Sequence, residues 1–207
     1  MPIEVQVAVA KVNMWAVRES GDTFEMVERP HGGLSFVLVD GQSHGTGAKR
    51  VSNLVARKAI ALLGEGVRDG AAARAAHDYL YTLRQGKVSA TLNIVSIDLA
   101  TRTLVIARNT HCPVVVGEGA QLRTLAEPAE AIGIRIRTRP QISELELAPR
   151  LTIVSFTDGL VDAGKRKGQS LDYLSLIQRA CAEQRHAQAI ADELLAAAVQ
   201  LDGGRPA

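Results

Sequence analysis

The chain has 207 residues, of which 46% are hydrophobic, and this length and composition suit one domain with a large buried core. Its 24 Lys and Arg nearly balance its 22 Asp and Glu, which argues against nucleic acid or an anionic membrane as partner. Cys112 and Cys181 lack the spacing of a disulfide framework or a zinc site, and no apolar run reaches the roughly 20 residues that span a bilayer. We therefore expect a single cytoplasmic domain over residues 1–207 that binds neither nucleic acid nor membrane.

The first third of the chain predicts short strands followed by two helices. Runs rich in β-branched and alternating apolar residues predict strands at 3–10, 14–18, 24–28 and 34–40, with breaks at 21–22 and 31–33. After Asp40 the apolar residues recur at intervals of three and four, which indicates an amphipathic helix with Thr46 as its N-cap. A second helix is expected from about Asp69 to the break at Gln85-Gly86.

From Ala90 the pattern returns to strands and then to helices. Strands are predicted at 91–98, 103–108, 114–117, 142–147 and 151–157, and helical patterns run through 174–181 and 190–201. Each amphipathic helix needs a sheet face to cover. The order therefore predicts an α+β fold, a four-layer αββα sandwich of two antiparallel β-sheets flanked by helix pairs.

Three aspartates stand beside a glycine at the ends of predicted strands: Asp22 after Gly21, Asp40 before Gly41, and Asp158 before Gly159. A carboxylate at the end of a strand is held on a rigid element at the rim of the sheet, and an adjacent glycine lets the main chain approach an ion. Oxygen ligands of this kind favour Mg²⁺ or Mn²⁺. Any single Asp-Gly pair is also typical of an ordinary turn, so the metal hypothesis rests on the combination.

The motifs around these aspartates resemble those of the type 2C metal-dependent protein phosphatases, in the bacterial SpoIIE branch. The resemblance extends from about Val12 to the end of the chain, and the compact stressosome phosphatases of the RsbX type are the most similar. It is carried by Gly21-Asp22, Asp40-Gly41-Gln42-Ser43-His44-Gly45, Ser89-Ala90-Thr91-Leu92, Arg108-Asn109-Thr110-His111-Cys112-Pro113, Ala131-Ile132-Gly133-Ile134 and Thr157-Asp158-Gly159-Leu160-Val161-Asp162.

The resemblance implies a role for each of these acidic positions. Asp40 would bridge two divalent cations, Mn²⁺ or Mg²⁺, the Gly41 carbonyl would bind one of them, Asp158 the other, and Asp22 would act through a metal-bound water. Two such cations activate water for attack on a phosphoryl group without a protein nucleophile. The implied activity is hydrolysis of phosphoserine or phosphothreonine on a bacterial regulatory protein, such as a STAS-domain anti-sigma antagonist or a stressosome component.

Several basic residues have two interpretations that the sequence leaves open. Arg18 lies at a place similar to that of a phosphate-binding arginine in some relatives, although its offset differs. His44 is either a general acid or a residue that orients the loop by hydrogen bonding. Arg135, Arg137 and Arg139 alternate, which in an extended segment would put them on one face, either to steer a phosphorylated partner or simply to face solvent.

The end of the sequence departs from the family pattern, which closes with an acidic pair and a last strand. We therefore expect the chain to lack that strand and one metal ligand, because Asp202, at a helix end, is a poor substitute. Two alternative functions follow. One is a catalytically impaired phosphatase-fold interaction module in a signalling complex, and the other is a metal-assisted phosphohydrolase that acts on small phosphoesters.

Overall fold

The computed structural model describes residues 3–30 and 32–206, so His31, within the predicted break at 31–33, lies outside the described residues. From residue 22 onward the helices and strands follow one another in the order predicted, with one strand, one short helix and one 3-10 turn added. They are β1 Asp22–Arg29, β2 Gly33–Gly41, α1 Gly45–Gly64, α2 Asp69–Arg84, β3 Ala90–Asp98, β4 Thr103–Asn109, β5 Val114–Glu118, β6 Gln121–Leu125, β7 Gln141–Glu146, β8 Leu151–Ser155, α3 Asp158–Val161, the 3-10 turn η1 Lys165–Lys167, α4 Tyr173–Ala182 and α5 Ala187–Leu201.

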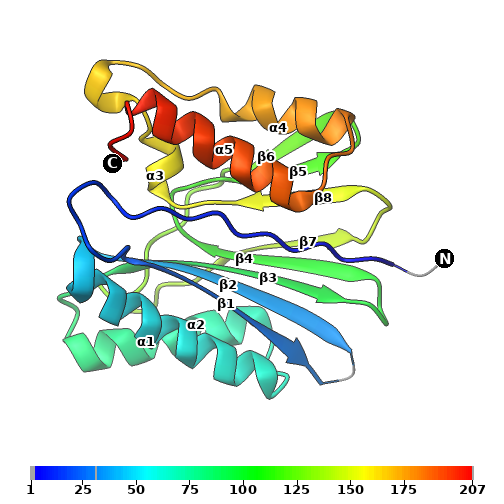
Figure 1. The fold of residues 1–207 in the computed structure, drawn as a ribbon. Coiled ribbons are helices and arrows are strands. Elements are labelled where there is room, and N and C mark those ends of the chain that lie inside the picture. Colours follow the sequence, from blue (N-terminus) through cyan, green and yellow to red (C-terminus); the bar gives the residue numbers. More distant parts are fainter. Residues whose placement is uncertain (1–2, 31, 207) are drawn as a thin grey trace. The chain divides into compact units, whose positions relative to one another are not determined.

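These elements form two compact units, each built on its own antiparallel sheet (Figure 1). The five-stranded unit comprises residues 19–111 and 127–147, with strand order β1-β2-β3-β4-β7 and helices α1 and α2. The three-stranded unit comprises the rest, with strand order β6-β5-β8 and helices α3, α4 and α5. The prediction of an α+β fold with two antiparallel sheets and their helix pairs is confirmed, and the single domain over 1–207 stays a prediction.

The core of the five-stranded unit lies between its sheet and the helix pair. Helices α1 and α2 lie side by side across one face of the sheet (Figure 1). Strand β2 alternates buried and half-buried side chains, and Val37 and Val39 on its inner face meet Val55 and Leu63 of α1 in one cluster. Because a shift of one residue would turn this apolar set out of the core, burial fixes the register of β2 against its neighbours. The same register determines which residues meet at the strand ends.

The three-stranded unit has a separate, smaller core. Val115 of β5 and Phe156 after β8 pack there with Ile177 of α4 and Leu194 of α5. Phe156 also contacts the ring of Tyr173 edge-on, with 5.1 Å between ring centroids. This packing anchors the segment that leads from β8 into α3, where Asp158 lies.

The strands predicted at 3–10 and 14–18 are wrong. Residues 3–13 run as an irregular segment, and a turn follows at Trp15 and Ala16. Val7, Val9 and Val12 remain 44%, 45% and 42% exposed. Their alternation has the period of a strand, but a strand also needs a partner to accept its main-chain hydrogen bonds, and none pairs with this segment among the described residues. The segment is instead held at single points, as where Gln6 Oε1 accepts the Ala187 amide at 3.4 Å.

Three local predictions also need correction. Helix α1 begins at Gly45 with His44 as its N-cap residue, so Thr46 lies inside the helix. Strand β6 was not predicted, because its sequence is short, polar and mostly exposed. Residues 133–137 form bends and a turn, with Arg137 at a φ of 65°, so Arg135, Arg137 and Arg139 do not alternate along an extended segment.

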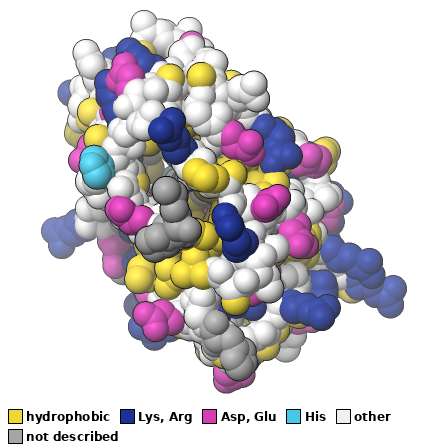
Figure 2. Space-filling view, turned by 90° about the vertical axis from the view of Figure 1, so that its right-hand side faces the viewer, with side chains coloured by type: hydrophobic (Ala, Val, Ile, Leu, Met, Phe, Trp, Pro, Cys, Tyr) yellow, Lys and Arg dark blue, Asp and Glu magenta, His cyan; other side chains and the backbone are white. Residues whose placement is uncertain are grey.

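The surface carries both signs of charge. Figure 2 shows basic and acidic side chains intermingled on the face that it presents, as expected from the near balance of the two in the sequence. Of the helices in the described part of the chain, none has the length and apolar character to cross a bilayer.

Candidate functional site

Asp22 and Asp40 are brought together by the pairing of β1 with β2. Asp22 begins β1, Asp40 is the penultimate residue of β2, and the two are direct partners in the antiparallel register. Directly opposed residues have Cβ atoms roughly 4.5–5.5 Å apart with side chains on the same face of the sheet. Two like charges in this position destabilise the pairing unless a cation lies near them. The pair therefore places two carboxylates, the ligand type that hard divalent cations prefer, next to each other at one end of the sheet.

Two glycines let helix α1 approach both aspartates closely. A Cβ at Gly41 would lie 2.1 Å from the Ala48 carbonyl oxygen, and a Cβ at Gly21 would lie 2.8 Å from the Ala48 Cβ. Neither distance is possible between non-bonded atoms, so both positions require glycine as the backbone now lies. The first turn of α1 thus rests directly on the two loops that carry Asp22 and Asp40.

Lys49 adds a polar tie between α1 and β1. Its ammonium donates to the Asp22 carbonyl oxygen at 2.7 Å and to Thr23 Oγ1 at 2.8 Å. Thr23 Oγ1 also lies 2.7 Å from Ser52 Oγ and donates to Asn53 Oδ1 at 2.8 Å. This network fixes the main chain at Asp22. Nothing in the sequence pattern marks Lys49, since a lysine on a helix ordinarily faces solvent.

The loop between Asp40 and α1 is held against the start of β3. The main-chain N–H of Gln42 donates to the Ser89 carbonyl at 3.1 Å, and the side-chain Oε1 of Gln42 accepts the Ser89 main-chain N–H at 2.8 Å. Ser43 adopts a φ of 77°, a left-handed conformation that costs a non-glycine residue about 1–2 kcal/mol. His44 is exposed and extended, and its imidazole makes no hydrogen bond to cap the helix. The imidazole is therefore available to a ligand.

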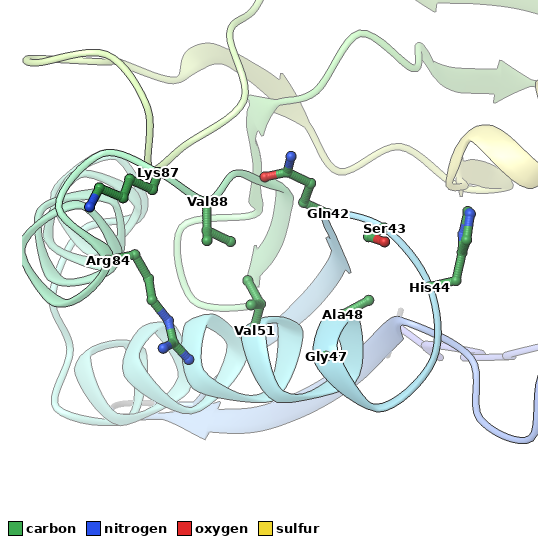
Figure 3. Close-up of a pocket in the computed structure, with 9 residues that line it drawn as sticks. All are labelled: Gln42, Ser43, His44, Gly47, Ala48, Val51, Arg84, Lys87 and Val88. Atoms are coloured by element: carbon green, nitrogen blue, oxygen red, sulfur yellow. The ribbon is translucent and has the colours of Figure 1, made fainter.

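A hollow of about 360 Å³, here called the α1–α2 pocket, opens beside this loop (Figure 3). Val51 of α1 and Val88 face one another across it, Arg84 reaches toward α1, and the side chain of Lys87 points outward. Its lining consists of Gln42, Ser43, His44, Gly47, Ala48, Val51, Arg84, Lys87 and Val88.

The remaining predicted site residues belong to the three-stranded unit. Asp158 is exposed at the first position of α3, and its main-chain oxygen accepts the Asp162 amide at 2.7 Å. Arg18 is exposed at the end of the N-terminal segment, where its carbonyl accepts Asn13 Nδ2 at 3.0 Å. Asp202, at the end of α5, accepts the Gly164 amide at 2.8 Å. The convergence of Asp158 and Arg18 with Asp22 and Asp40 stays a prediction.

The donor set can be tested against the cations that the sequence suggests. Within residues 3–30 and 32–206 there is no group of three or more His, Cys, Asp or Glu side chains that could hold a metal ion. Asp22 and Asp40 alone supply a partial oxygen set. Such a set fits Mg²⁺ or Mn²⁺, which are bound by one or two carboxylates and keep several waters, better than it fits Zn²⁺.

A buried histidine in the five-stranded unit was not predicted to matter. His77 of α2 is 2% exposed, and its Nδ1 accepts the Gly133 amide at 3.0 Å. Burial lowers the pKa of His77, and the nearby carboxylate of Asp78 opposes this shift. The neutral ring of His77 therefore holds the loop at Gly133 against α2 by accepting its main-chain N–H.

The fold and the motifs around Asp40 and Asp158 are those of a known protein family. The model of the Stage II sporulation protein E (SpoIIE) family matches residues 30–207. The chain belongs to the SpoIIE family. As a SpoIIE-type domain it has the PP2C phosphatase fold, the class to which serine/threonine phosphatases of this family belong.

Solved structures of SpoIIE-type and related domains share this fold. The PP2C phosphatase domain of SpoIIE from Bacillus subtilis, solved with a fragment of its regulatory domain, has a TM-score of 0.76 at 20% identity, covering 90% of this chain and 55% of that one. The SiaA-PP2C domain of Pseudomonas aeruginosa has a TM-score of 0.76 at 21% identity, covering 93% of this chain and 79% of that one. The RsbU and RsbW domains of a Mycobacterium tuberculosis protein have a TM-score of 0.72 at 19% identity, covering 99% of this chain and 60% of that one. No protein with a curated description matches the sequence significantly.

Proposed function

We propose that this domain removes phosphate from serine or threonine of a regulatory protein in a reaction that depends on Mn²⁺ or Mg²⁺. The observation that carries the proposal is the pairing of Asp22 with Asp40 at the ends of β1 and β2, with the first turn of α1 pressed against both loops. A pair of adjacent carboxylates on rigid strands is suited to hold a cation in one place.

In this proposal each ligand has a defined task. Asp40 and the main-chain carbonyl of Gly41 would hold the cations directly, Asp22 would act through a bound water, and Asp158 would supply a further ligand. Two bound divalent cations would lower the pKa of water and neutralise the phosphoryl oxygens. Lys49 keeps the main chain of Asp22 in place through its hydrogen bond to the carbonyl.

Two further side chains are proposed to contact the substrate phosphate. The exposed imidazole of His44 makes no hydrogen bond to cap helix α1, which it precedes directly after the Asp40 loop. The guanidinium of Arg18 is likewise exposed, and its planar fork matches phosphate oxygens. We propose that both orient the phosphoryl group while the carboxylates hold the cations.

The proposed partner is a phosphorylated bacterial regulatory protein in the cytoplasm, such as a STAS-domain anti-sigma antagonist or a stressosome component. Membership of the SpoIIE family supports this choice. So does the Mycobacterium tuberculosis relative, in which RsbU and RsbW domains occur in one protein. Neither nucleic acid nor membrane is proposed as a partner.

Replacing Asp40 tests the proposal directly. We expect Asp40→Asn to reduce the Mn²⁺-stimulated rate on a phosphoserine peptide at least about 10²-fold, because a cation ligand loses its charge. Mn²⁺ binding measured by calorimetry should weaken in parallel. The matched control is Asp192→Asn, which removes an exposed carboxylate on α5. An unchanged rate in Asp40→Asn would eliminate the mechanism.

A catalytically impaired interaction module is the second candidate. The absence of a group of three or more ligand side chains within the described residues favours it. Calorimetry on the unmodified chain separates the two candidates. Binding of Mn²⁺ together with phosphopeptide hydrolysis supports the enzyme, whereas tight binding of a phosphoprotein without metal binding or turnover supports the module.

A further inference from the structure

The α1–α2 pocket adjoins the Asp40 loop, and apart from His44 its lining residues have no task in the proposed reaction. Gln42, which forms part of its lining, lies two residues after Asp40, so their Cα atoms are at most about 7 Å apart. The hydrogen bonds between Gln42 and Ser89 hold this wall against the segment that carries Val88. If the phosphorylated residue of a protein substrate lay at Asp40, the residues next to it in the substrate would therefore lie at the pocket.

The pocket and its surroundings are basic. Arg84 and Lys87 line it, the lining contains no acidic residue, and neither cation forms an ion pair with the described residues. Residues 45–88 contain eight Lys and Arg against three Asp and Glu, a net charge of +5, whereas the whole chain carries +2. One of those acids, Asp69, is already paired with Arg29. The segment that supplies most of the pocket lining therefore carries a net positive charge.

Exposed apolar side chains lie close to the same rim. A Cβ at Gly86 would be 3.4 Å from the Ile134 carbonyl oxygen, so the 133–137 turn adjoins the loop that carries Lys87. In that turn Ile134 is 42% exposed and Ile136 is 72% exposed. Arg137 in the same turn and Arg139 just after it form no ion pair with the described residues. Cations mixed with exposed isoleucines suit a peptide that has both acidic and apolar residues.

We propose that the α1–α2 pocket, with the 133–137 turn at its rim, is the docking site for an acidic segment that flanks the phosphorylated residue of the protein substrate. The proposal rests on the proposed function, whose substrate it makes more specific. The pocket volume lies within the range of about 300 to 1,000 Å³ that is common for ligand sites. A nucleic acid fits less well, because its affinity comes from many phosphate contacts and the pocket offers only two lysine or arginine side chains.

The experiment measures docking and hydrolysis separately. Docking is measured by fluorescence anisotropy with two phosphoserine peptides, one flanked by Asp and Glu and one with the same positions changed to Asn and Gln. Hydrolysis is measured with both peptides and with p-nitrophenyl phosphate, which has no flanking chain. The test variant is Arg84→Glu with Lys87→Glu. The matched control is Arg74→Glu, about 15 Å away from Arg84 along α2 and outside the pocket.

We expect the unmodified chain to bind the acidic peptide about tenfold more tightly than the neutral one at an ionic strength of about 50 mM, with a smaller difference at high salt. The double variant should lose this preference and raise KM for the acidic peptide about tenfold. Its hydrolysis of p-nitrophenyl phosphate should stay within about twofold, which also reports that it folds. Arg74→Glu should behave like the unmodified chain.

The contrary outcomes are distinct. Equal binding of the two peptides by the unmodified chain, or equal impairment by Arg74→Glu, overturns the docking proposal. Stronger competition by a single-stranded RNA than by the acidic peptide also overturns it. If the acidic peptide binds as expected but no substrate is hydrolysed with Mn²⁺, docking stands and the proposed function fails.

Discussion

Two polar clusters lie at opposite ends of strand β2 in the five-stranded unit, and they differ in how charge is balanced. At one end, Arg29 Nη1 lies 3.3 Å from Asp69 Oδ2 and donates to Ser35 and Ser96, whose hydroxyls are 2.6 Å apart. About 17 Å further along the strand, Asp22 faces Asp40. We call the first the Arg29 network and the second the Asp22–Asp40 pair.

The Arg29 network is complete without any partner from outside. Its one carboxylate has a guanidinium and a serine hydroxyl as donors, and Arg29 also donates to the Val67 carbonyl at 3.0 Å. In the Asp22–Asp40 pair two residues of like charge are direct cross-strand partners, and the ammonium of Lys49 donates to the Asp22 carbonyl oxygen and to Thr23 Oγ1. The comparison teaches that a closed network stabilises the fold, whereas a pair with excess negative charge can bind a cation.

Breaking the Arg29 network should have the largest effect on stability. Asp69→Asn leaves a mostly buried guanidinium without its counter-ion, which costs about 3–5 kcal/mol of unfolding free energy. Asp40→Asn should cost little or even stabilise the fold, because it relieves like-charge repulsion. Urea denaturation of both variants checks this contrast. Equal destabilisation would contradict the distinction between the two clusters.

The next largest effect is expected at Lys49, as a positioning residue. Lys49→Met should lower kcat about tenfold with KM for the phosphopeptide unchanged, because one charge-assisted hydrogen bond to Asp22 is lost at about 1.5–3 kcal/mol. Lys49→Arg should recover part of the rate. The control is Arg50→Met, which removes the same charge from an exposed neighbour. If Arg50→Met loses as much activity, net charge and not the tie to Asp22 is responsible.

The smallest effect concerns pH. Because burial lowers the pKa of His77 in the folded chain, the unfolded chain binds more protons as the pH falls below about 6.5. Stability should therefore decrease with falling pH from that point. In His77→Asn, which keeps an acceptor for the Gly133 amide, this part of the decrease should disappear. Denaturation curves at about pH 7.5 and pH 5.5 give the comparison, and parallel losses in both proteins would exclude His77 as the cause.

Sequence patterns were sufficient where structure depends on local periodicity. The apolar run before Asp40 predicts a strand that ends at that residue, and β2 ends one residue later. The helical intervals from Val51 to Leu62 predict α1. The sequence pattern predicts that the strand after Asp22 begins at Phe24, whereas β1 begins at Asp22 and pairs it with Asp40.

Contacts between distant parts of the chain could not be predicted in the same way. The tie from Lys49 to Asp22 and the acceptor role of His77 depend on how helices lie on the sheet, and neither residue type signals it. The N-terminal segment shows the converse error, since Val7 and Val9 have the alternation of a strand but no strand pairs with them among the described residues. An alternating pattern of apolar residues does not by itself supply a hydrogen-bonding partner for the main chain.

The close approach of α1 to the Asp40 loop restricts which side chains the chain can accept there. With 2.1 Å between a Cβ at position 41 and the Ala48 carbonyl oxygen, even one methyl group would push the helix start outward. Ala48, itself buried, has its methyl group 2.8 Å from where a Cβ at Gly21 would lie. In a library that varies positions 21, 41 and 48, functional clones should thus be limited to the smallest residues, while Thr46 and Gly47, which are exposed, should accept many.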